Sequence, residues 1–228
     1  MLHQHLELAG RSRLLGALSP SVRACLLSKA RVRNFPRGAT IFIQVEQART
    51  LKIVLEGRIK LYRVAPSGCE AIVEVCSPGR SFEEIATLRG EAHRVSAQAA
   101  TDASLLFVDL AGIDACPGAH QELTQAALAA AAESLDMLLD EVEQLKVQNG
   151  AQRLSGFLLS FCDGREGRCE FDLPYEKHLI AGRLGMKPES LSRAIGRLRR
   201  QGVAIRSDRV TIEDAGSLRR FLSDDPAM

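Results

Sequence analysis

The stretch YEKHLIAGRLGMKPESLSRAIGRLRRQ, residues 175–201, decides how the C-terminal part of the chain folds. Its apolar residues recur at helical spacing over Tyr175–Leu184 and again over Pro188–Gln201, so the stretch predicts two helices. Gly185-Met186-Lys187 between them predicts a tight turn, and the second helix begins with proline and ends before Gly202. These features predict a helix-turn-helix, held together by Leu179, Leu184, Leu191, Ile195 and Leu198.

The other face of the second helix carries polar and charged side chains. A helix that enters the DNA major groove N-terminus first offers base edges to its first two turns and phosphates to its flanks. The runs Val203–Arg206 and Val210–Glu213 predict a β-hairpin that forms the wing of a winged helix. We therefore expect double-stranded DNA as the partner, contacted by Lys187, Glu189, Ser190, Ser192, Arg193, Gly196, Arg197, Arg200, Arg206 and Arg209.

Positive charge is concentrated in the same segment. The whole chain has a formal net charge of only +2. Residues 183–209 hold eight basic and two acidic residues, and this local net charge of +6 can neutralise several phosphates. A purely structural role would also explain individual charged residues of this segment. Glu189 suits the first turn of any helix, and Arg193 is its i+4 partner.

Upstream, residues 117–149 give the clearest helical pattern in the chain. Apolar residues seven apart form an a/d seam about three heptads long, and acidic residues occupy the opposite side. One interpretation is an amphipathic helix packed on its own β domain. The other is a helix that pairs with its copy and makes the protein a homodimer through Leu128, Ala131, Leu135, Leu138, Val142 and Leu145.

The N-terminal half predicts short helices followed by a β-roll. Residues 1–30 suggest one or two helices, with Ser19-Pro20 as N-cap and first-turn proline. Short β-like runs between regular turns follow, at Thr40–Gln44, Lys52–Leu55, Arg58–Val64, Ala71–Val75 and Ser104–Val108. The fold class is therefore α+β, with a sensor roll over 1–116, a dimerisation helix over 117–149 and a winged helix-turn-helix over 150–228.

The apolar runs and the cysteines of the chain indicate where in the cell the protein is located. The longest apolar run, Ala126–Ala132, is too short to span a membrane, and the N-terminus lacks an export signal, so we expect a cytoplasmic protein with no membrane partner. The six cysteines include no Cys-x-x-Cys, and we interpret them as free thiols in a reducing compartment.

Several motifs resemble the CRP/FNR superfamily of transcription regulators over nearly the whole chain. Glu189–Arg193 is similar to its Glu-x-x-Ser-Arg reading head, and Gly57–Tyr62 with Ser67–Glu70 resembles its Gly-x-Val-Lys-Leu-Tyr and Asp-Gly-Arg-Glu hairpin. Within the superfamily the whole chain most resembles the Dnr-type branch, which is associated with nitric oxide sensing through haem, and Lys187–Arg193 carries much of that similarity. The resemblance implies a cyclic-nucleotide-binding-type roll (a double-stranded jelly roll), a TTGAT-type inverted repeat as palindromic operator, and RNA polymerase as partner if the protein activates.

The effector pocket departs from the pattern of cyclic-nucleotide-binding relatives. Glu83-Glu84 stands where they have Gly-Glu, and Arg94-Val95 where they have Arg-Ser. An extra carboxylate repels a phosphate and Val95 lacks a hydroxyl donor, which argues against cyclic AMP. Glu84 and Arg94 form either an internal salt bridge, which we favour, or an effector pocket completed by Leu135 and Leu138.

The sequence gives fewer indications about other cofactors than about cyclic AMP. Cys25 stands alone in the N-terminal segment, which argues against an iron–sulfur cluster held by four thiolates. Haem binding is an open alternative, and so is a role for the Cys76 thiol as a ligand or sensor. We expect Cys76 to be a buried strand residue. The available imidazoles are His3, His5, His93, His120 and His178.

Two other function classes fit less well. A cupin-type enzyme needs clustered histidine and carboxylate ligands for a metal, and only His93 lies in the roll, so we expect no enzyme activity. A scaffold that dimerises without binding DNA leaves the ordered face of Glu189, Ser192 and Arg193 unexplained.

Overall fold

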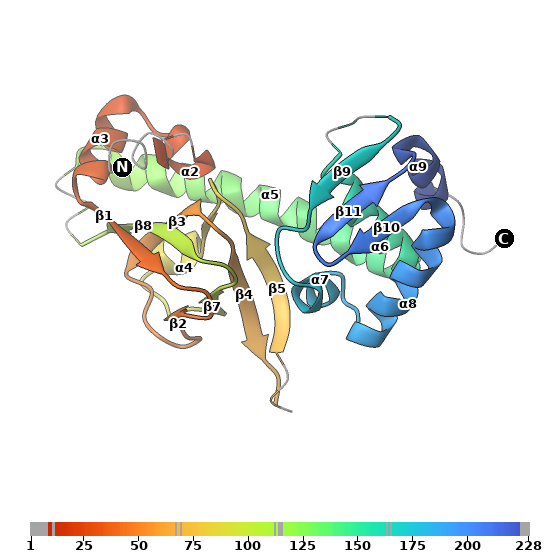
Figure 1. Cartoon of the computed structure of the whole chain (residues 1–228). Helices are drawn as coiled ribbons and strands as arrows, with labels where there is room; N and C mark the ends of the chain where they lie inside the picture. The colour runs from red at the N-terminus through yellow and green to blue at the C-terminus, as the bar shows by residue number, and fades with distance from the viewer. Residues whose placement is uncertain are drawn as a thin grey trace. The chain divides into compact units, whose positions relative to one another are not determined.

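The chain forms two compact units, Met1–Asp136 and Met137–Met228. The computed structural model describes residues 9–223 except 11, 67, 69, 112, 114, 115, 163 and 165. The elements follow the predicted order of a β-roll with leading helices, a long helix and a winged helix-turn-helix (Figure 1). The α+β fold class is therefore confirmed.

The roll consists of two four-stranded antiparallel sheets that share a core. Aromatic and aliphatic side chains from both sheets fill it, among them Phe35, Phe42, Val54, Leu61 and Leu105. One sheet has the order β1 (Ala30–Phe35), β8 (Ala103–Asp109), β3 (Thr50–Glu56) and β6 (Ser81–Phe82). The other has the order β2 (Thr40–Phe42), β7 (Ser96–Ala99), β4 (Ile59–Val64) and β5 (Glu70–Cys76), and a short helix, α4 (Glu84–Leu88), follows β6.

Two helices at the N-terminal end pack on the first turns of the long helix. They are α2 (Arg13–Gly16) and α3 (Pro20–Ser28), and the Ser19 side chain caps α3 as predicted by accepting from Val22 N. The long helix, α5 (Ala119–Val147), buries Ala119, Leu123, Ala126 and Ala127 in one core with Leu14, Leu15, Leu18, Val22 and Leu26.

Polar contacts reinforce this packing. The backbone N–H and the hydroxyl of Ser19 both donate to the Glu122 carboxylate, at 2.7 and 2.8 Å. Arg13 pairs with Glu133 further along α5, at 2.5 Å between Nη1 and Oε2. The leading helices are thus attached to α5 at several points along its first half.

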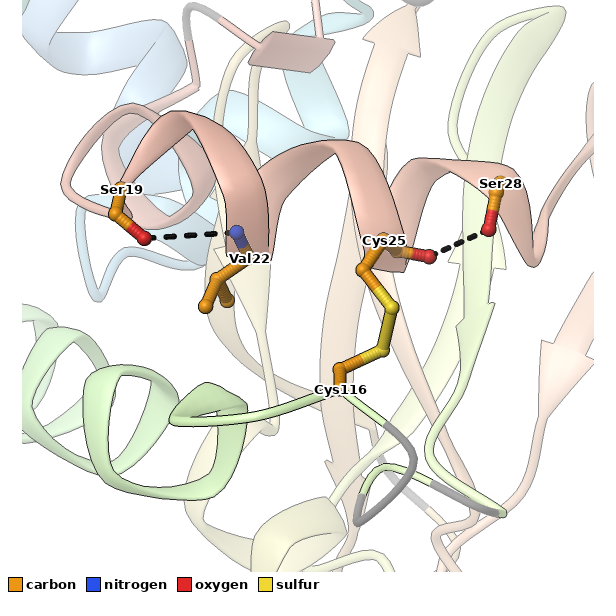
Figure 2. Close-up of a disulfide and its surroundings, with 5 residues drawn as sticks. All are labelled: Ser19, Val22, Cys25, Ser28 and Cys116. Carbon is orange, nitrogen blue, oxygen red and sulfur yellow. Dashed lines mark hydrogen bonds between the residues drawn. A yellow bond between two sulfur atoms is a disulfide. The ribbon is translucent and has the colours of Figure 1, made fainter.

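A disulfide joins Cys25 on α3 to Cys116, three residues before α5 begins (Figure 2). The prediction of free thiols is therefore wrong for these two cysteines. The reason is topological, because 91 residues separate them in sequence and only the packing of α3 beside the start of α5 brings them together. Cys76 and Cys169 are buried free thiols, whereas Cys69 lies outside the described residues.

Beyond its first turns, α5 turns its apolar side chains to solvent. Leu128 is 66% exposed, Leu135 58% and Leu138 50%, and Val142 and Leu145 are exposed as well, whereas Ala131 is half-buried. The interpretation of a helix packed on its own domain therefore describes the first turns of α5, whereas pairing with a second copy stays a prediction. The first turns pack within the N-terminal unit, and the large apolar side chains at the predicted seam positions are exposed.

The second unit buries aliphatic side chains, among them Leu154, Leu158, Leu198, Val210 and Leu218. Ring contacts also join Phe157 to Phe161 and Tyr175, and Phe161 to Phe171. Its sheet has the order β10 (Val203–Arg206), β11 (Arg209–Ile212) and β9 (Cys169–Asp172). Its helices are α6 (Gly150–Leu159), α7 (Lys177–Arg183), α8 (Pro188–Leu198), the 3-10 turn η2 (Arg199–Gln201) and α9 (Ala215–Ser223). Among the described helices of the chain, none is both long and apolar enough to cross a membrane.

Candidate DNA-binding site

The second helix of the helix-turn-helix, α8, has one buried and one exposed face. Lys187 precedes the helix with extended backbone, and Pro188 supplies the first turn, where its missing N–H costs nothing. Leu191, Ala194 and Leu198 are buried against the unit. Ser190 is half-buried, and the other predicted DNA-contacting residues on this segment are exposed: Lys187, Glu189, Ser192, Arg193, Gly196, Arg197 and Arg200.

Two serines on α8 have different local partners. Ser190 accepts a hydrogen bond from Arg193, 3.2 Å from Oγ to Nη2, so it orients the guanidinium. Ser192 donates from its hydroxyl to the Pro188 carbonyl, one turn back, at 3.0 Å. Arg193 therefore lies on the exposed face with its direction set by a neighbour, as a bidentate base contact requires.

The predicted wing forms as a β-hairpin in which Arg206 pairs with Arg209 across the turn. Arg209 is held by carboxylates of β9, at 3.3 Å from both Glu170 and Asp172. Hydrogen bonds to these two carboxylates, mainly the one to Glu170, raise the pKa of Arg209. The pKa of Glu170 is lowered, mainly by its hydrogen bond from Arg168. Arg206 and Arg209 are both exposed, but the charge of Arg209 is already compensated in part.

The turn before α8 is clamped to the end of α5. The Arg153 guanidinium donates to the Gln148 carbonyl at 2.7 Å and to the Leu184 carbonyl at 3.1 Å. Gly185 has a φ of +62°, and a Cβ there would lie 2.9 Å from Leu145 Cδ2. The last turn of α5 and the helix-turn-helix are thus in direct contact, which sequence reasoning missed because the pattern marks Gly185 only as a turn residue.

The predicted salt bridge between Glu84 and Arg94 is wrong. Arg94 is exposed and its Nη2 pairs with Glu91 at 3.4 Å, while Glu84 opens α4. The neighbouring carboxylate, Glu83, takes the interior position instead. Its φ of +59° is the left-handed conformation that glycine, which cyclic-nucleotide-binding relatives have here, adopts readily.

Glu83 anchors a buried polar network in the roll. Its Oε2 accepts from Arg94 N at 2.9 Å and lies 3.1 Å from His93 Nδ1. The imidazole of His93 stacks on Phe42 and its Nε2 is 3.4 Å from Lys52 Nζ. Burial raises the pKa of Glu83, but the hydrogen bonds from His93 and Arg94 N outweigh it and lower the pKa below its usual value.

Lys52 gives this network a measurable pH dependence. Burial lowers its pKa from 10.5 to about 8, against the opposing attraction of Glu83. Above pH 8 the folded chain releases a proton that the unfolded chain still holds, so this group's contribution to stability rises with pH. Between pH 7.5 and 9 we expect wild type to gain about 1 kcal/mol in free energy of unfolding relative to Lys52→Met. Urea unfolding at both pH values measures this, and parallel pH curves would contradict it.

The buried histidine among the described residues, His93, has no ring nitrogen left for a haem iron. Both ring nitrogens of His93 already have partners, and His93 stacks on Phe42. His120 is exposed on α5, and His178 is exposed and pairs with Glu176 at 3.1 Å. His3 and His5 lie outside the described residues. Within the described part of the chain, no three His, Cys, Asp or Glu side chains gather as a metal-binding group.

Cys76 is buried in β5, as the sequence predicts. Burial, followed by the charge of Glu74, raises the pKa of its thiol well above the usual value. A thiol of this kind stays protonated near neutral pH and is a poor nucleophile.

Comparisons with known proteins match both units. A model of the cyclic nucleotide-binding domain matches residues 32–116, and a model of the Crp-like helix-turn-helix domain matches residues 152–221. A crystal structure from Ruegeria pomeroyi, described as a cyclic nucleotide binding protein, is 40% identical with a TM-score of 0.69, covering 98% of this chain and 99% of that one.

Two curated relatives are named as regulators. The CRP-like cAMP-activated global transcriptional regulator of Mycobacterium tuberculosis is 24% identical over 221 residues, covering 94% of this chain and 98% of that protein. The nitrogen fixation regulation protein FixK of Azorhizobium caulinodans is 28% identical over 195 residues, covering 82% of this chain and 77% of that protein.

Proposed function

The chain belongs to the CRP/FNR superfamily of DNA-binding transcription regulators, and from that premise we propose that it reads an inverted repeat of TTGAT-type half-sites as a homodimer. The observation that carries the proposal is the exposed face of α8, where Glu189, Ser192 and Arg193 project from a helix whose other side is buried. The carboxylate, the hydroxyl and the guanidinium, in this order along the helix, can form hydrogen bonds with base edges in a major groove.

The exposed apolar face of α5 supports the dimer. Five large apolar side chains at seam positions are between 44% and 66% exposed, namely Leu128, Leu135, Leu138, Val142 and Leu145. A stripe of this length is typical of a helix that pairs with its copy. A dimer with a twofold axis has two copies of α8 related by that axis, which matches the symmetry of an inverted repeat.

The proposed division of labour follows from these parts. Residues 1–116 sense the signal, 117–149 form the dimerisation helix and 150–228 bind DNA. A signal received by the roll changes how the two α5 helices cross, and the clamp at Arg153 carries that change to the reading head. In this proposal the protein works in the cytoplasm, with RNA polymerase as a further partner if it activates transcription.

Titration of labelled duplexes tests the DNA-binding proposal. We expect two chains per duplex on an inverted TTGAT repeat, and weaker binding to a scrambled duplex and to a repeat with five extra base pairs between its half-sites. Half a helical turn of extra spacing moves the second half-site to the far side of the DNA. Equal affinity for all three duplexes, or one chain per duplex, contradicts the proposal.

We propose that the signal is a redox change or a gas such as nitric oxide, as in the Dnr-type branch, and not cyclic AMP. The Glu83 carboxylate, which accepts from Arg94 N, supports this, because a fixed anion repels a phosphate from the same place. Absorption spectra with added haem, before and after nitric oxide, separate the two signals. A Soret band that shifts with nitric oxide supports the gas signal. A spectrum without one, together with a thiol-dependent DNA affinity, supports the redox signal.

A further inference from the structure

We propose that Cys25 and Cys116 form a reversible thiol–disulfide site that is opened by thiol reductants and that sets the DNA affinity through the start of α5. The proposal rests on the proposed function and specifies its redox signal. In the disulfide state α3 is tied to Cys116, three residues before α5 begins (Figure 2). In the dithiol state that tie is absent.

The position of the disulfide makes it a control point for α5. The Cα atoms of the two cysteines are 6.1 Å apart, within the usual range for a bridge. Cys116 also takes part in the turn that starts α5, since its N–H donates to Ile113 O at 2.9 Å and its carbonyl accepts from Ala119 N at 3.0 Å. A change at Cys116 therefore acts on the backbone of the first helical turn.

The opposite end of α3 has its own attachment to α5. Ser19, the N-cap of α3, donates twice to Glu122, whereas Cys25 lies on the last turns of α3 next to Ser28 (Figure 2). Reduction consequently leaves α3 fixed at its beginning and releases its end. The expected change is a local loosening of α3 and the first turn of α5, without unfolding of the unit.

The two sulfur atoms differ in access, which sets the direction of the exchange. Cys25 is half-buried, whereas Cys116 is 2% exposed. A thiolate of the reductant attacks Sγ of Cys25, the S–S bond breaks, and Cys116 leaves with the electron pair and takes up a proton. A second thiol then displaces the reductant from Cys25. Two Cys thiols and one disulfide of the reductant result, and a small-molecule disulfide reverses both steps.

The proposed function makes this disulfide conditional. A regulator bound to chromosomal DNA shares the compartment of the cellular thiol pool, where disulfides of mesophilic proteins are mostly transient and redox-sensing. A permanent structural staple would not be expected in that compartment. The bridge therefore fits a site that is oxidised only when the pool itself is oxidised.

Loosening the start of α5 is expected to weaken DNA binding. Ala119 and Leu123 are held in the core with α3, and the exposed seam begins five residues later, at Leu128. A helix that is firmly held at its start presents the seam already ordered. In the dithiol state part of that ordering must occur on dimerisation, and the free energy for it is lost from DNA binding.

The experiment compares DNA affinity in oxidised and reduced dithiothreitol, with the full chain and the inverted-repeat duplex. Alkylation and mass mapping at each ratio report whether Cys25 and Cys116 are bridged. We expect the reduced form to bind the duplex at least about threefold more weakly, and re-oxidation to restore the affinity. Hydrogen exchange is expected to rise in residues 24–28 and 116–119 on reduction.

Variants separate the bridge from other effects of the reductant. Cys25→Ser and Cys116→Ser should each bind with the affinity of the reduced protein and ignore dithiothreitol. Cys76→Ala removes a different thiol of the same unit and should keep the response. Ser19→Ala weakens the other end of α3 and should lower the affinity in both redox states while keeping the response.

Three outcomes overturn the proposal: no bridge under oxidising conditions, a bridge whose reduction does not weaken binding at least about threefold, or a response that persists in Cys25→Ser. Failure of the proposed function looks different, because then no duplex is bound specifically in either redox state. In that case the mass and hydrogen-exchange measurements still decide whether the pair is a reversible site that holds α3 to α5.

Discussion

Replacing Leu135 and Leu138 together by glutamate is expected to convert the protein to a monomer and to weaken binding to the inverted repeat at least about a hundredfold, or about 3 kcal/mol. Both leucines are at least half exposed in the single chain and lie on the same face of α5. A twofold pairing would bring four new carboxylates into the dimer contact, where like charges repel and lose their hydration.

Sedimentation equilibrium and duplex titration measure the two parts of this effect. The matched control is the double variant Met137→Glu, Gln144→Glu. It adds the same charge to the same helix at exposed positions, each two residues after a seam residue, Leu135 or Val142. The control should remain dimeric and bind DNA within a few-fold of wild type. A dimeric Leu135→Glu, Leu138→Glu protein would place the interface elsewhere.

Replacing Arg193 by alanine is expected to cost about 1–3 kcal/mol of binding to the matched site and to relax the sequence preference at one base pair of each half-site. The Arg193 side chain is exposed and is oriented by Ser190, so its donors are available to a guanine edge. The loss on a scrambled duplex should be much smaller, because that duplex offers no matched base.

Arg200→Ala is the matched control, since it removes the same charge from the exposed segment just after α8. We expect it to weaken binding to matched and scrambled duplexes by similar factors and to reduce the salt dependence. Equal losses on both duplexes for Arg193→Ala would mean that Arg193 contacts phosphate. Its role in reading bases would then be wrong.

The sequence predicted best the parts whose signal is local. The two helices around Gly185 and the wing strands are where the apolar period and turn residues put them, within a few residues. Three strands of the roll were missed. Arginines alternate through β1, β7 reads Ser-Ala-Gln-Ala, and β6 has only two residues, so none has the β-branched pattern by which a strand is recognised.

The parts that could not be predicted depend on contacts between distant segments. Nothing local distinguishes Cys25 or Cys116 from a free thiol, since their pairing requires α3 to lie beside the start of α5. Glu83 combines a left-handed backbone with a hydrogen bond from Arg94 N to its carboxylate, and neither has a local signal in the sequence. The exposed segment of α5 was predictable as a seam, but not the residue at which burial ends.

Because Arg153 holds the end of α5 to the turn before α8, the length of α5 matters more for DNA binding than the identity of most of its residues. The end of the helix is in contact with the turn that carries the reading head, so the reading head shares the rotational phase of the helix. One residue inserted between the seam and the clamp would turn the reading head by about 100° around the helix axis, whereas seven would nearly restore the phase. Exposed side chains of α5 outside the seam can therefore change with little effect, whereas residues can be added or removed only in steps of about two helical turns.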